Sequence, residues 1–138
     1  MEEEALFGIE LNEDSISHLR ETAKWANFLA ILGIIVLSLM VLGGIFMTLI
    51  ATAALPIGGI FMFFIYLVFA AVYAVPIYYL YKFAQTTKYA LNSPNSFQLA
   101  EALGYLKSTF KFMGILAIAM LCLYALIFMF GGVLGLFL

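Results

Sequence analysis

The feature that most constrains this chain is the run of residues 25–81, which contains no Asp, Glu, Lys, Arg or His. At ~1.5 Å per residue, about 20 apolar residues cross the ~30 Å hydrocarbon core of a bilayer. The run is therefore too long for one membrane span and long enough for two. Its interruption at residues 51–56, which ends in Pro56, predicts a tight apolar turn. A third run without these charged residues, 112–138, predicts a third span.

The composition excludes a soluble globular fold. Of the 138 residues, 66% are hydrophobic and 10% are charged, whereas soluble domains are about 45–50% apolar and about 25% charged. A soluble core would leave too much apolar surface in water. No basic pattern typical of nucleic-acid binding occurs, so we expect no nucleic-acid partner. The acidic start, Met1-Glu2-Glu3-Glu4, and the length of the first apolar run predict a retained span rather than a cleaved signal peptide.

We therefore predict an all-α integral membrane protein with three transmembrane helices, of which the second and third extend beyond the membrane as a cytoplasmic antiparallel helical hairpin. Residues 1–11 are expected to form a flexible acidic tail and residues 12–138 a single membrane domain. This domain divides into a juxtamembrane helix (12–25), span one (26–51), span two (56–81), the helical hairpin (82–111) and span three (112–136).

The juxtamembrane helix has a clear start signal. Asn12 is a suitable N-cap, because its side-chain oxygen accepts a free backbone N–H. One helix is expected from Glu13 to about Ala51. Its first turns are amphipathic and should lie at the membrane surface. The apolar residues with 3,4,3,4 spacing are Ile16, Leu19, Ala23, Ala26 and Ala30.

The helical hairpin is predicted to turn at residues 92–95, with Asn95 or Ser96 capping the next helix. One apolar face at 4,3,4,3 spacing then continues into span three and favours a hairpin that projects from the membrane. The alternative is a separate helix over residues 96–107 lying on the membrane surface. The apolar face comprises Leu99, Leu103, Leu106, Phe110 and Met113.

The basic residues predict the orientation. All six Lys and Arg lie in segments 1–24 and 82–111, and none lies at the opposite membrane face. Because basic residues near span ends stay in the cytoplasm, the N-terminus and the helical hairpin should be cytoplasmic and the C-terminus should lie on the opposite side.

Aromatic and basic side chains mark the membrane edges. Amphipathic rings prefer the headgroup layer, and lysines there extend to water. Lysines 82, 88, 107 and 111 could also attract anionic lipid headgroups, although the orientation rule alone explains their position. The predicted interface anchors are Trp25, Tyr78, Tyr79, Tyr81, Lys82 and Lys111.

Small residues recur along spans one and three. Such residues let helices approach closely in lipid, where van der Waals packing drives association. They would serve either a specific oligomer contact or packing within the chain, and the second interpretation is favoured. The helix-packing candidates are Ala26, Ala30, Gly33, Gly44, Thr48, Gly131 and Gly135.

Polar candidates at membrane depth are few. Tyr66 and Tyr73 are seven residues apart on one helical face and predict either a polar cleft or hydrogen bonds to Thr48 or Ser38. Pro76 breaks one backbone hydrogen bond in span two, and we interpret it as a structural kink.

The search for catalytic chemistry yields no catalytic, cofactor-binding or metal-binding residue. No P-loop, dinucleotide fingerprint or HExxH motif occurs. His18 is interpreted as a solvated surface residue. Cys122, the only cysteine, is expected to be a small apolar core residue near mid-bilayer.

Segments 23–33, 78–83 and 106–111 resemble an uncharacterised family of small bacterial membrane proteins, a domain-of-unknown-function family frequent in Bacteroidetes. The resemblance covers Leu11 to about Gly132. It implies a multi-pass protein of the bacterial inner membrane and carries over no catalytic residue.

Two functions remain open. The favoured one is a non-enzymatic accessory or interaction subunit that packs through its small-residue faces, with the lipid bilayer and either a second copy or another membrane protein as partner. The alternative is an oligomeric pore or small-solute carrier whose path is lined by Tyr66, Tyr73, Ser38 and Thr48. No cofactor is expected for either.

Overall fold

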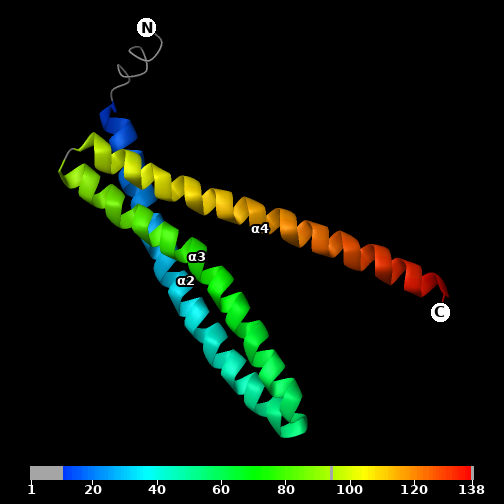
Figure 1. Cartoon of the computed structure of the whole chain (residues 1–138). Coiled ribbons are helices and arrows are strands. Elements are labelled where there is room, and N and C mark those ends of the chain that lie inside the picture. Colours follow the sequence, from blue (N-terminus) through cyan, green and yellow to red (C-terminus); the bar gives the residue numbers. More distant parts are fainter. Residues whose placement is uncertain (1–10, 94, 138) are drawn as a thin grey trace.

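The computed structural model describes residues 11–93 and 95–137, and these residues form helices joined by short turns. The helices are α2 (Glu13–Ala54), α3 (Pro56–Asn92) and α4 (Ser96–Phe137), as Figure 1 shows. All three are long and apolar enough to cross a membrane, which confirms the predicted all-α class with three candidate spans. The tail predicted for residues 1–11 lies outside the described residues except for Leu11.

Helix α2 begins where the sequence predicts. The backbone N–H of Ser15 donates to Oδ1 of Asn12 at 2.8 Å, which satisfies one free donor of the first turn. The helix continues to Ala54, three residues beyond the predicted end. On the predicted apolar face, Ala23, Ala26 and Ala30 are buried, and Ile16 and Leu19 are half-buried.

Helices α2 and α3 form an antiparallel hairpin with Leu55 as the only residue between them. Pro56 lies in the first turn of α3, where its missing N–H costs nothing. The two helices approach so closely here that a Cβ on Gly59 would overlap the side chain of Thr52 and lie 2.9 Å from the Thr52 Cα. Only glycine fits this position without a backbone shift.

Helix α3 bends along its length (Figure 1), and Pro76 lies in its interior. Proline removes one hydrogen bond and its ring clashes with the preceding turn, which is the usual cause of such a bend. The N-terminal part of α3 follows α2, while its C-terminal part also runs alongside α4 (Figure 1).

Helix α4 is continuous from Ser96, so a separate helix over residues 96–107 is wrong. Its first turn is capped by Asn95, whose Oδ1 accepts from the Phe97 N–H at 3.0 Å. The predicted apolar face is also wrong in part. Leu103, Phe110 and Met113 are exposed, and the residues buried on α4 are instead Ala102 and Thr109. Small side chains allow the close approach to α3 that the larger ones would prevent.

The second half of α4 leaves the α2–α3 hairpin (Figure 1). Every residue from 117 to 133 is exposed. Cys122 is among these residues, so its predicted place in a packed core is wrong. It lacks a core because no other described helix of the chain lies beside this part of α4.

Candidate functional site

The three helices meet at the polar end of the molecule. Ala26 of α2, Phe83 and Ala84 of α3, and Ala102 of α4 form one buried cluster, which we call the junction. Phe83 is fully buried, with 0% of its surface exposed. Three alanines around one phenylalanine let three helices approach a single large side chain, so the junction fixes how the helices diverge.

Thr87, on the same helix as Phe83, has a fully buried hydroxyl without a hydrogen-bond partner among the described residues. The other buried threonine, Thr109, donates to the carbonyl of Tyr105 at 3.0 Å. A buried hydroxyl without a partner costs about 1–3 kcal/mol, so Thr87 is an energetic weak point next to the junction.

Tyrosines line the contact between α3 and α4. The rings of Tyr79 and Tyr105 lie 6.4 Å apart, and the Tyr105 hydroxyl donates to Glu101 at 3.3 Å. Desolvation, and then the nearby Glu101 carboxylate, raise the pKa of Tyr105 above its ordinary value of 10.0. The hydroxyl therefore remains a hydrogen-bond donor at neutral pH. Tyr79, predicted as an interface anchor, is half-buried and contributes to helix packing as well.

Of the other predicted anchors, Lys82 is half-buried and the rest are exposed. Trp25 is exposed and packs edge-on against Phe28 at 5.9 Å between ring centroids. The Lys82 ammonium lies 5.8 Å from the ring centroid of Tyr78, within range of a cation–π attraction. Tyr81 and Lys111 are exposed, as expected for side chains that reach a headgroup layer.

The small residues of α2 face α3. A Cβ on Gly33 would lie 2.8 Å from Ile77, and one on Gly44 would lie 3.0 Å from the Tyr66 ring. Thr48 donates to the Gly44 carbonyl at 2.7 Å, within its own helix. These contacts are of the kind expected for packing within the chain.

The small residues at the end of α4 are placed differently. A Cβ on Gly131 or Gly135 would meet nothing within 4 Å. The two glycines thus leave a smooth stretch of helix surface that none of the described residues covers.

Tyr66 and Tyr73, the candidates for a polar cleft, have different surroundings. Tyr66 lines a cavity of about 210 Å³ between α2 and α3, whose other lining side chains are apolar. Tyr73 is exposed and does not line it. Ser38, a predicted partner, donates to the carbonyl of Ile34 at 2.8 Å.

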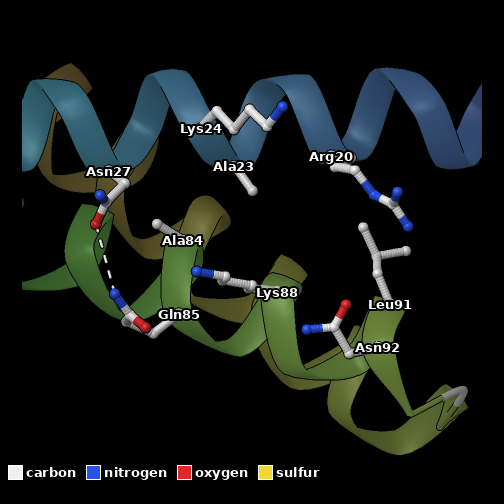
Figure 2. Close-up of a pocket in the computed structure, with 9 residues that line it drawn as sticks. All are labelled: Arg20, Ala23, Lys24, Asn27, Ala84, Gln85, Lys88, Leu91 and Asn92. Carbon is white, nitrogen blue, oxygen red and sulfur yellow. Dashed lines mark hydrogen bonds between the residues drawn. The ribbon is translucent and has the colours of Figure 1, made fainter.

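A second cavity, of about 270 Å³, lies between the polar ends of α2 and α3 (Figure 2). We call it the basic cleft, because three of its lining side chains are cationic. Gln85 donates to Asn27 across it at 3.4 Å, the one hydrogen bond between side chains of these two helices in the described chain. The cleft is lined by Arg20, Ala23, Lys24, Asn27, Ala84, Gln85, Lys88, Leu91 and Asn92.

The sequence does not predict the basic cleft. Arg20 and Lys24 are four residues apart and share a helical face, which is a usable signal. Their counterparts on α3 are more than fifty residues away, and only the antiparallel hairpin brings them opposite. Among the residues that the structure describes, no group of His, Cys, Asp or Glu could hold a metal ion. The cleft offers positive charge and amide donors, which bind anions rather than cations.

The fold and the site together indicate a small multi-span membrane protein with a basic cleft at its polar end. Comparison of the chain with known protein families, curated proteins and solved structures found no match. The resemblance of segments 23–33, 78–83 and 106–111 to a bacterial family therefore stays a prediction.

Proposed function

We propose that the protein is a non-enzymatic accessory or interaction subunit of a bacterial inner membrane, and that the membrane part of α4 docks on a helix of a partner. The observation that carries this proposal is the exposure of every residue from 117 to 133. Three spans packed as one bundle would each bury a face. Here α2 and α3 pack against each other, and residues 117–133 of α4 pack against neither.

The physics of helix association in lipid supports this assignment. Lipid tails are as apolar as leucine, so exposure to lipid alone costs α4 little. What α4 lacks is the close van der Waals contact that α2 and α3 obtain from each other. The smooth surface at Gly131 and Gly135 allows a second helix to approach closely. A helix from another chain would supply the missing contact.

The proposed orientation puts the junction and the basic cleft at the cytoplasmic side of the membrane. All six basic residues lie at that end of the chain's spans, and basic residues near span ends stay inside. A reporter enzyme that is active only outside the cytoplasm should therefore be active when it is fused after Leu138. A reporter that is active only inside the cytoplasm should be inactive there.

Cys122 provides the test of docking, because it is the only cysteine and is exposed on α4. A benzophenone-maleimide attached to it in native membranes is expected to form, on illumination, a covalent adduct with a protein. An adduct of twice the chain's mass would identify a second copy, and any other defined mass a different subunit.

The matched control moves the probe to the α2–α3 hairpin. In Cys122→Ser/Leu39→Cys the reagent would sit near the middle of span one, at a side chain that is 63% exposed. We expect at most a weak adduct there. Equal yields from both positions, or no protein adduct from Cys122, would contradict the proposal.

A further inference from the structure

The basic cleft gathers positive charge from two helices. Arg20 and Lys24 come from α2 and Lys88 from α3, and among the residues that the structure describes no Asp or Glu lines the cleft. Glu21 lines a neighbouring groove on α2, which Arg20 and Lys24 also line, so these two cations lie between the cleft and that carboxylate. Like charges held together repel one another, and an anion between them removes that cost.

The three cationic side chains come from both helices that form the walls of the cleft. In Figure 2, Arg20 extends from α2 toward Leu91 of α3, and Lys88 runs along α3. Lys24 runs along α2 (Figure 2). A guanidinium presents a planar pair of donors that matches two oxygens of a phosphate, and an ammonium adds a point charge.

The amides close one side of the cleft. The hydrogen bond from Gln85 to Asn27 uses the Asn27 oxygen. The NH₂ group of Asn27 remains as a donor, as does that of Asn92 at the opposite end. The cleft thus combines three cations with neutral donors, which is the chemistry of an oxyanion site.

The volume of the basic cleft and its depth in the membrane restrict which anions could bind there. A volume of about 270 Å³ is below the ~300–1,000 Å³ of typical sites for drug-sized ligands, so a headgroup-sized anion fits better than a large cofactor. From Trp25 to Ala54 the hairpin is about 45 Å long at ~1.5 Å per residue, close to the ~40–45 Å of a bilayer with its headgroups. Arg20 and Lys24 lie within about 8 Å of Trp25 along α2, at the level of lipid phosphates.

We infer that the basic cleft binds a phosphate-bearing anion, and that in the membrane this anion is the headgroup of an acidic phospholipid. The site is independent of docking by α4. A competing role for the same charges is to stabilise the C-terminus of α3, which ends at Asn92 and carries partial negative charge. That role would not depend on lipid, so a lipid-dependent measurement separates the two.

The test is native mass spectrometry of the full chain in micelles holding equal amounts of phosphatidylglycerol and phosphatidylcholine. The wild type should retain phosphatidylglycerol preferentially. Arg20→Gln/Lys88→Gln should lower this preference roughly 30-fold, as expected for two basic groups at a membrane surface. Lys107→Gln/Lys111→Gln removes the same charge from a groove between α3 and α4 that Glu101 also lines, and it should lower the preference much less.

Arg20→Lys provides a milder variant that keeps the charge and loses the planar donor pair. It should show an intermediate preference and melt like the wild type in phosphatidylcholine alone. Equal retention of phosphatidylglycerol by all variants, or an equal loss of preference in both double variants, would show that the lipid is held by general attraction to basic surface charge. Either result would overturn the site.

Two further outcomes would also overturn parts of the inference. Displacement of phosphatidylglycerol by millimolar inorganic phosphate would show that the occupant is a soluble phosphate and would overturn the lipid assignment. A lower melting temperature of Arg20→Gln/Lys88→Gln that phosphatidylglycerol does not influence would assign the charges to the end of α3 and overturn the binding site.

Discussion

The α2–α3 hairpin and the membrane half of α4 are similarly apolar, yet only the hairpin packs. Along the hairpin, glycines lie close to larger side chains of the facing helix, as at Gly33 with Ile77 and Gly44 with Tyr66. On α4, a Cβ on Gly131 would meet nothing within 4 Å. Apolar composition therefore places a helix in lipid, while complementary small and large side chains decide whether it pairs.

The most severe test of this difference compares two phenylalanines. Phe83 is 0% exposed at the junction and Phe128 is 83% exposed on α4. Phe83→Ala should lower the free energy of unfolding by about 3–5 kcal/mol because it empties the core. Phe128→Ala should change it by less than about 0.5 kcal/mol. Thermal melts in mild detergent measure both. Similar losses would mean that α4 packs within its own chain after all.

A substitution at the tight turn of the α2–α3 hairpin should cause the next largest loss of stability. Gly59→Ala should destabilise the protein by up to about 3 kcal/mol, because the new methyl would overlap Thr52 and the nearby backbone. The neighbouring Gly58→Ala is the control, since the nearest atom to its Cβ is on Leu55 at 3.5 Å. It should be neutral or slightly stabilising, as alanine favours a helix over glycine. Unfolding in increasing SDS would report both, and equal effects would argue against a close approach.

Two buried threonines in the packed region should respond differently to the loss of their hydroxyl groups. Thr87→Val should stabilise the protein by about 1 kcal/mol, because it removes a buried hydroxyl that has no partner among the described residues. Thr109→Val should instead cost about 1 kcal/mol, because this hydroxyl donates to the Tyr105 carbonyl. Their melting temperatures should move in opposite directions. A loss from Thr87→Val would show that its hydroxyl finds a partner in solution.

The smallest expected change in stability comes from the substitution of Gly44 in span one. A Cβ on Gly44 would lie 3.0 Å from the Tyr66 ring, which is a side chain that is able to shift. Gly44→Ala should therefore cost about 1 kcal/mol at most, whereas Gly43→Ala meets nothing within 4 Å and should be neutral. A photo-crosslinker at Cys122 should give unchanged yields in both variants, since neither touches α4. A changed yield would link hairpin packing to docking.

The two apolar faces expected from the sequence, on α2 and on α4, differ in how far the structure buries them, and the reason is physical. On α2 the face formed by Ala23, Ala26 and Ala30 is the buried one, because small residues and helical periodicity agree there. On α4 the periodic large residues Leu103 and Phe110 face outward. Beside a membrane, periodicity of large apolar residues marks a surface that lipid tolerates as well as a core does.

The sequence by itself determined the three long apolar helices, the cap at Asn12 and the turn between the first two helices. These follow from local physics: hydropathy, free backbone donors and the fixed geometry of proline. The tertiary structure alone decided the divergence of α4 and the placement of Arg20 and Lys88 on the walls of one cleft. Both depend on the register and angle at which distant helices pack, and these are set by the shapes of side chains that are not neighbours in the chain.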